Sequence, residues 1–199
     1  MKIIFATGNK GKVYEIRKIL ADLDAEIVPM NEAGISLDIE ENGSTYEENA
    51  LIKARAVMKA SGCLTLADDS GLEIDYLKGE LGIHSARFMG HDTSYDLKNA
   101  EILRRLEGVP DEERTARFVC SIAAVFPDGR EEVVRATMEG RIAHGTSGGN
   151  GFGFDPIFFL PDRGCTSAVI SDEEKNEISH RGKALRLMRD RLIELGVFQ

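Results

Sequence analysis

The hydrophobic pattern at the start of the chain predicts a buried strand, a polar loop and a helix. Residues 2–6 are mostly apolar, and residues 7–12 after them are polar and rich in glycine and lysine. A short strand is then expected around Ile27-Val28, so the opening is typical of an α/β fold. The apolar residues at helical spacing in the first expected helix are Val13, Ile16, Ile19 and Leu20.

A second helix and two further strands are predicted next. Ser44 and Glu47 fit a capping box at the start of the helix. Residues 63–67 have the pattern of a buried strand that ends at the polar tetrapeptide 68–71, and another strand is expected over 72–76. The apolar face of the helix is formed by Ala50, Leu51, Ala54, Val57 and Met58.

The second half of the chain predicts a helix, a hairpin, a loop and a final helix. The helix is expected over 93–106, and the hairpin over 117–126 and 132–137 with a turn at 127–129. Glycine recurs so densely over 140–153 that a long site-forming loop is expected there. Buried positions are expected at Leu97, Ile102, Leu103 and Leu106 of the third helix, and at Ala184, Leu185, Met188 and Leu192 of a helix from about 181 to 195 that Gly196 ends.

Composition favours a single globular domain over residues 1–199, because 42% of the residues are hydrophobic and can bury a sizeable core. A formal net charge of -9 leaves no broad basic surface for a nucleic-acid polymer, so a small nucleotide is the favoured partner. The isolated cysteines Cys63, Cys120 and Cys165 indicate a reduced, cytoplasmic protein. No run of about 18 apolar residues occurs, so no membrane segment is expected.

The glycine loop is a candidate phosphate site. Residues 8–12 lie between a strand and a helix, where amide groups, lysine side chains and the helix N-terminus attract anions. The loop is not a Walker A motif, because Val13 follows Lys12 where that motif has Ser or Thr. A glycine turn with solvated lysines is the alternative for this loop. Lys53 on the second helix either extends past an apolar face or contacts phosphate.

Paired carboxylates are candidates for binding a metal ion and a water. Asp68 and Asp69 end an apolar strand, and in an extended chain their side chains point to opposite faces unless Ser70-Gly71 bends it. Glu40-Glu41 offers a second carboxylate, and Mg²⁺ prefers such a sparse oxygen set together with substrate phosphates. A capped turn at 68–69 and a solvated loop at 40–41 are the alternatives.

Two segments are candidates for binding a nucleobase. Phe152 and Phe154 flank a glycine and precede Asp155, so an aromatic face and an acceptor for a ring N–H lie together. Lys175 and the sequence Ser179-His180-Arg181 supply donors suited to the carbonyl oxygens of an oxidised or deaminated purine. Core phenylalanines and a simple helix cap at Ser179 are the alternatives.

Three rival readings involve other classes of protein. Residues 145–149 match the pattern of a hydrolase nucleophile elbow, and the glycines at 149, 151 and 153 suggest a dinucleotide loop. Neither segment is followed by a predicted helix, so both readings are discounted. A regulator that binds purine nucleotides without catalysis is the third, and release of pyrophosphate distinguishes an enzyme from it.

Taken in order, five segments resemble the inosine/xanthosine triphosphate pyrophosphatase family, whose members are also called dITP/XTP or non-standard purine nucleotide pyrophosphatases. The resemblance covers nearly the whole chain. Its markers are residues 7–12, 48–54, 67–72, 152–158 and 179–185.

The resemblance implies hydrolysis of ITP, dITP and XTP to the monophosphate and pyrophosphate with Mg²⁺. It also implies a homodimer whose subunit is a two-lobed α/β domain with an elongated mixed sheet, flanking helices and a cleft between the lobes. Glu40 and Asp69 would bind the metal, and Asp69 would also accept the proton of the attacking water. The substrate-binding residues it implies are Thr7, Gly8, Asn9, Lys10, Gly11, Lys12, Lys53, Ser70, Phe152, Gly153, Phe154, Asp155, Lys175, His180 and Arg181.

Overall fold

The computed structural model describes residues 1–198, with only the backbone at Lys10. Its strands form a sheet of seven in the order β2-β1-β3-β4-β5-β6-β7. The sheet is mixed, because β1 is parallel to β2 and β3 while β6 is antiparallel to β5 and β7. The strands are β1 Lys2–Phe5, β2 Glu26–Pro29, β3 Thr65–Ile74, β4 Thr115–Val125, β5 Glu131–Ile142, β6 Phe158–Leu160 and β7 Cys165–Thr166. The α-helices are α1 Lys10–Ile19, α2 Tyr46–Ser61, α3 Tyr95–Arg105, α4 Asp172–Ile178 and α5 His180–Glu194.

These elements confirm the predicted α/β fold with a mixed sheet and flanking helices. The chain divides into two compact units. Unit 1 contains Met1–Ser70, Cys120–Ala136 and the C-terminal residues from His180, whereas unit 2 contains Gly71–Val119 and Thr137–Ser179. The single domain expected over 1–199 stays a prediction.

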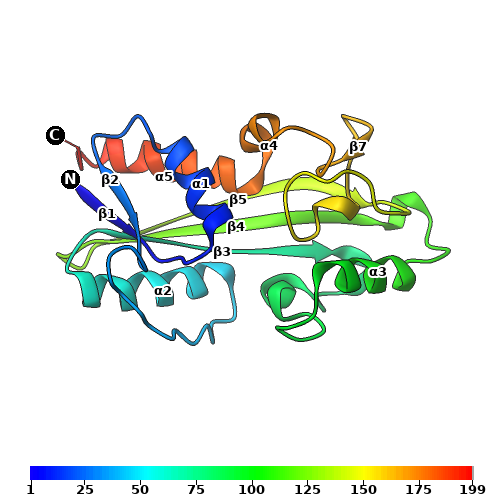
Figure 1. Ribbon diagram of the computed structural model, residues 1–199, viewed down its shortest axis with the longest axis horizontal. Helices are drawn as coiled ribbons and strands as arrows, with labels where there is room; N and C mark the ends of the chain where they lie inside the picture. The colour runs from blue at the N-terminus through cyan, green and yellow to red at the C-terminus, as the bar shows by residue number, and fades with distance from the viewer. Residues whose placement is uncertain (199) are drawn as a thin grey trace. The chain divides into compact units, whose positions relative to one another are not determined.

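In unit 1, helices cover both faces of the strands. Helices α1 and α5 lie on one face and α2 on the other (Figure 1). Successive strand residues alternate between these faces, so Leu66 packs with α1 and α5 while Ala67 packs with α2. The fully buried Ala50 and Ala54 give α2 a small-residue surface against the sheet. No helix in the part of the chain that the structure describes is long and apolar enough to cross a membrane.

Unit 2 has its own core, formed by residues that include Leu72, Ile102, Ile142 and Phe158. Arg114 is also buried here, with its guanidinium hydrogen-bonded to backbone carbonyl oxygens. The Arg114 side chain therefore links backbone segments inside this core and does not extend into solvent.

Two predicted boundaries around the second helix are wrong. Thr45, not Ser44, is the N-cap of α2, since its Oγ1 accepts the Glu48 N–H over 3.1 Å. The two strands expected on either side of residues 68–71 are one strand, β3. The strand continues because Leu72 and Ile74 carry the alternation of buried positions into the core of unit 2.

Two predictions in the second half are also wrong. Leu97 is 60% exposed because, five positions before the buried Ile102, it lies about 140° away around α3. Strand β5 extends to Ile142, into the segment expected to be a loop. Gly140 allows this pairing, since a Cβ there would lie 2.5 Å from the carbonyl oxygen of Phe159 on the next strand. The predicted final helix is confirmed as α5, and α4, β6 and β7 were not anticipated.

Candidate active site

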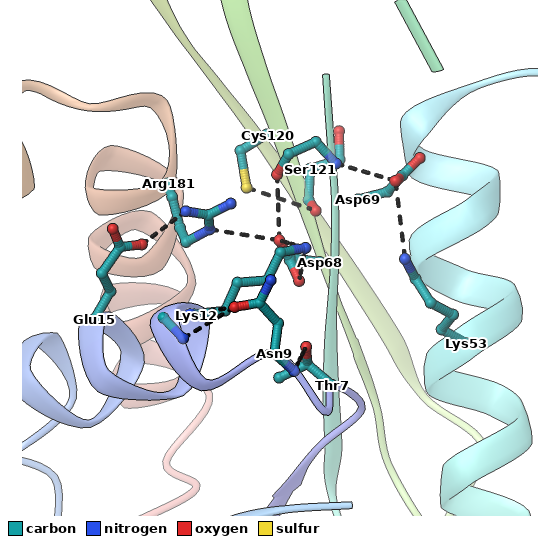
Figure 2. A network of polar contacts seen from close by, with 12 residues as sticks. Thr7, Asn9, Lys12, Glu15, Lys53, Asp68, Asp69, Cys120, Ser121 and Arg181 are labelled. Atoms are coloured by element: carbon teal, nitrogen blue, oxygen red, sulfur yellow. Dashed lines mark hydrogen bonds and ion pairs between the residues drawn. The ribbon is translucent and has the colours of Figure 1, made fainter. Parts of the chain in front are cut away.

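Asp68 and Asp69 are neighbours on β3 whose side chains point to opposite faces of the sheet (Figure 2). Asp68 points toward α1 and α5, and Asp69 points toward Lys53 on α2. Both are buried, at 1% and 8% exposure. The chain stays extended through Ser70, so the bend considered from the sequence does not occur, and each aspartate has its own set of partners.

Asp68 lies in a buried group of opposite charges. Lys12 Nζ is 2.8 Å and Arg181 Nε 3.5 Å from its Oδ2, and Arg181 also pairs with Glu15 over 2.7 Å (Figure 2). Burial alone would raise the pKa of Asp68, but Lys12 and Arg181 outweigh it and hold that pKa well below the usual range. Asp68 is therefore a permanently ionised anchor for two cations.

Cys120 lies beside the same group and is chemically quiet. Burial, together with the nearby Asp68 carboxylate, raises the pKa of the Cys120 thiol to about 12. A thiol protonated at neutral pH is a poor nucleophile. We therefore assign Cys120 no catalytic role.

The glycine loop is capped by one of its own side chains. Asn9 Oδ1 accepts the N–H groups of Gly11 over 2.9 Å and Lys12 over 3.2 Å, and Thr7 Oγ1 accepts the Asn9 N–H. Two amides expected to be free for phosphate are thus already bonded within the loop. Among the described residues, the Gly8 N–H has no partner. The side chain of Lys10 lies outside the described part of the structure.

Asp69 lies in a second polar cluster on the α2 side. Asn49 donates to Asp69 Oδ2 over 3.1 Å, and Lys53 Nζ is 3.8 Å from Asp69 Oδ1 and 2.9 Å from Glu41 Oε2. Burial raises the pKa of Asp69, although Lys53 and the Asn49 hydrogen bond oppose it. Asp69 is consequently the more basic of the two adjacent carboxylates.

Lys53 holds two carboxylates of unit 1 together. Burial alone would lower the pKa of Lys53, but the charges of Asp68, Asp69 and Glu41 outweigh it and raise that pKa. Lys53 therefore stays an ammonium. Glu41 makes the contact with this cluster, whereas Glu40 is exposed.

The donor set fits a sparse Mg²⁺ site. Within residues 1–198, no three His, Cys, Asp or Glu side chains converge to form a complete metal site. Mg²⁺ is usually held by one or two carboxylates, with waters and substrate phosphates as its other ligands. Asp69 and Glu41 already share one cation, Lys53, which shows that the two carboxylates lie close enough to act on one charge.

Asp155 is the centre of a polar cluster in unit 2. Its Oδ2 accepts Lys175 Nζ over 2.6 Å and the Phe152 N–H over 2.8 Å, and its Oδ1 accepts Ser167 Oγ over 2.7 Å. Asp155 is 2% exposed. Since its oxygens are already bonded, the carboxylate orients Lys175 and Phe152.

The two phenylalanines of this segment differ in their surroundings. Phe152 is 43% exposed, so part of its ring is accessible for stacking. Lys175 Nζ lies 5.0 Å from the centroid of the same ring. Phe154 is buried and packs edge-on against Tyr95 at 5.1 Å between centroids. Asn99 holds this segment from α3 by donating to the Gly153 carbonyl oxygen over 3.1 Å.

The predicted base-binding residues belong to both compact units. Lys175 belongs to the Asp155 cluster of unit 2, whereas Arg181 belongs to the Asp68 cluster of unit 1 and His180 is buried in the same unit. Sequence reasoning missed several partners of the site. Only helical spacing offered a signal for Glu15, three residues after Lys12, and for Asn49, four residues before Lys53. The missed residues are Glu15, Asn49, Tyr95, Asn99 and Ser167.

Comparison with known proteins agrees with this fold. The model of the Ham1 family matches residues 3–191. A dITP/XTP pyrophosphatase from Clostridium perfringens is 44% identical over 197 residues, which is 96% of this chain and 97% of that protein. A dITP/XTP pyrophosphatase from Nitratidesulfovibrio vulgaris is 47% identical over 199 residues, which is 97% of this chain and 94% of that protein.

Solved structures agree as well. The Ham1 protein of Staphylococcus aureus superposes with a TM-score of 0.88 at 40% identity, covering 98% of this chain and 99% of that one. A HAM1 protein from Coxiella burnetii gives a TM-score of 0.90 at 39% identity, with the same coverage. The chain belongs to the Ham1 family, which confirms the resemblance drawn from the five sequence segments.

Proposed function

We propose that the chain hydrolyses non-standard purine nucleoside triphosphates, namely ITP, dITP and XTP, to the nucleoside monophosphate and pyrophosphate. The observation that carries this proposal is the buried Asp69, held by Asn49 and faced by Lys53 and Glu41. The relatives named dITP/XTP pyrophosphatase support the same reaction.

The residues of unit 1 supply the hydrolytic chemistry. Lys12, Lys53 and the Gly8 N–H attract the triphosphate. Asp69, whose raised pKa suits a proton acceptor, takes the proton of the attacking water. The water oxygen bonds to the α-phosphorus, the bond to the α–β bridging oxygen breaks, and pyrophosphate leaves with the electron pair.

Mg²⁺ is proposed as the cofactor, bound by Asp69 and the acidic pair at 40–41. When bound, it supplies positive charge that offsets the charge of the phosphate oxygens. Asp68 is not proposed as a ligand, because Lys12 and Arg181 already neutralise it.

The Asp155 cluster of unit 2 supplies base selectivity. The Lys175 ammonium donates to a purine carbonyl oxygen, and the exposed face of Phe152 stacks on the ring. Adenine presents an amino group instead of this carbonyl, so it would meet a donor with a donor, and such mismatches are heavily disfavoured. His180 and Arg181 are proposed as further donors.

A pyrophosphate-release panel tests the proposal. ITP, dITP, XTP, GTP and ATP are each assayed with and without Mg²⁺, and fast release from the first three with Mg²⁺ is expected. Tight binding of ITP without any release of pyrophosphate would support a non-catalytic regulator, which no observation favours. Release of single phosphates from ATP would also contradict the proposal.

We also propose a homodimer, as the family resemblance implies, located in the cytoplasm, as the isolated cysteines indicate. Light scattering coupled to size-exclusion chromatography measures the oligomeric state directly. A mass of one subunit across micromolar concentrations would contradict the dimer.

A further inference from the structure

Asn49 connects the two acidic parts of the unit 1 cluster. Its side chain is 1% exposed and lies near the start of α2. The side-chain nitrogen donates to Asp69 Oδ2 over 3.1 Å, and the side-chain oxygen accepts the Gly43 N–H over 2.8 Å. A primary amide donates to a carboxylate and accepts from a backbone N–H at once, which neither a carboxylate nor an ammonium does.

The segment on the other side of Asn49 is attached closely to α2. A Cβ at Gly43 would lie 2.7 Å from Asn49 Oδ1 and 2.7 Å from Glu48 Cβ, so only glycine permits this approach. Ser44 donates from its N–H and its Oγ to Glu48 Oε2 over 2.6 and 2.7 Å. The position of the acidic segment 40–41 is therefore set by attachments at residues 43–44.

Asn49 and the Ser70 N–H together fix the rotation of the Asp69 carboxylate, because Ser70 donates to Oδ1 over 3.0 Å while Asn49 donates to Oδ2. Since Oδ2 accepts from Asn49, Oδ1 is the oxygen that faces Lys53 at 3.8 Å. Lys53 in turn contacts Glu41 over 2.9 Å. Without the amide, Asp69 Oδ2 would lose its donor, only the Ser70 N–H would hold the carboxylate, and the 40–43 segment would lose its bond to the same helix.

We propose that Asn49 is a positioning residue that holds Asp69 and the 40–43 segment in the arrangement needed to bind one divalent cation. This role rests on the proposed function, because the cation serves the pyrophosphatase reaction. Partners that orient metal ligands typically change metal affinity or activity about 10–100-fold when removed.

Metal binding by the unmodified chain and by variants at position 49 tests this role. Asn49→Leu keeps the branched shape but removes both hydrogen bonds, and Asn49→Ser is too short to span them. The probe is Mn²⁺ alone, titrated in the absence of nucleotide and followed by its electron paramagnetic resonance signal. Both variants are expected to bind Mn²⁺ about tenfold or more weakly. Affinity within twofold of the unmodified chain would overturn the role of Asn49.

A matched control comes from the same helix. Arg55 pairs with Glu131 over 2.7 Å, outside the Asp69 cluster, so Arg55→Ala removes an α2 interaction without touching the site. It is expected to leave the Mn²⁺ affinity unchanged. If it weakens Mn²⁺ binding as much as Asn49→Leu does, the effect belongs to the stability of α2 and the proposal fails.

Gly43→Ala probes the same connection from the other side. Its methyl group forces residues 43–44 away from Asn49, so Mn²⁺ affinity is expected to fall and the double variant with Asn49→Leu to add little further loss. Fully additive losses would overturn a shared connection. Absence of pyrophosphate release from ITP by the unmodified chain would refute the proposed function instead, which keeps the two failures distinct.

Discussion

Lys175 donates a 2.6 Å hydrogen bond to Asp155, and both side chains are buried in unit 2. The pair places an ammonium under the ring of Phe152 with its charge already balanced. Contacts within the chain therefore already hold the residues that are proposed to select the base.

Lys175→Met is expected to destabilise the protein by about 3–5 kcal/mol, because it leaves the Asp155 carboxylate buried without its cation. Urea unfolding measures this loss. Adding Asp155→Asn should recover part of it, since the uncompensated charge disappears. If Lys175→Met and Asp155→Asn, each made alone, unfold like the unmodified chain, the buried pair is not formed in solution.

Loss of Lys175 should also change substrate choice. The preference for ITP over ATP, expressed as the ratio of kcat/KM values, is expected to fall about tenfold or more when this donor is lost. The double variant with Asp155→Asn is assayed because it restores folding without the donor. An unchanged ratio in that double variant would show that Lys175 takes no part in base recognition.

Asp69→Asn is expected to lower kcat by about 10²–10⁴-fold while KM for ITP changes far less, because an amide accepts no proton from water. Steady-state assays at saturating Mg²⁺ separate the two constants. Asp75→Asn is the control, since Asp75 pairs with Arg117 in unit 2, outside both clusters. An equal loss in affinity and turnover would argue against a role in proton transfer.

Arg114→Leu is expected to destabilise unit 2 by about 2–4 kcal/mol, because several buried carbonyl oxygens lose charge-assisted hydrogen bonds. The guanidinium donates to the carbonyl oxygens of Ile142, Leu106 and Ala143 over 2.8, 2.6 and 2.7 Å. Thermal and urea unfolding measure the change. A loss below about 0.5 kcal/mol, typical of surface substitutions, would contradict this structural role.

Asp75 should contribute to acid sensitivity with a defined sign. Hydrogen bonds from Arg117 and Thr115 lower the pKa of Asp75 in the folded protein, so its stabilisation is complete above the unfolded pKa and disappears as pH falls through the folded pKa. Asp75→Asn should therefore flatten unfolding stability below about pH 4, by under about 1 kcal/mol because solvent screens the pair. Urea midpoints from pH 7 to pH 2 measure it: the two proteins should differ at neutral pH and converge in acid, and the same difference at every pH would contradict it.

Features set by local periodicity were predictable from the sequence. The buried strand before Asp68 and the helix after the glycine loop follow from apolar spacing, and both occur in the structure. Errors arose where tertiary packing decided the outcome. Leu97 has the right residue type for a core position, but the packed face of α3 carries Ile102 and Leu106, and Leu97 lies on another face.

Much of the site depends on contacts between distant segments, which periodicity does not encode. Glu15 pairs with Arg181, 166 residues later in the chain, and Ser167 donates to Asp155 across 12 positions. The sequence identified Asp69, Asp155 and Lys175 as chemically important. It could not show that both carboxylate oxygens of Asp155 accept hydrogen bonds from the chain itself, because that depends on how the chain folds around Asp155.

The opposed directions of Asp68 and Asp69 limit how β3 can change in evolution. One residue inserted or deleted just before this pair would exchange the two faces, turning Asp68 toward α2 and Asp69 toward α1, so that both would lose the partners they now contact. Substitutions alter one side chain at a time, whereas such a slip exchanges both environments together. Strand β3 should therefore tolerate conservative replacement along its length but no change in length ahead of Asp68.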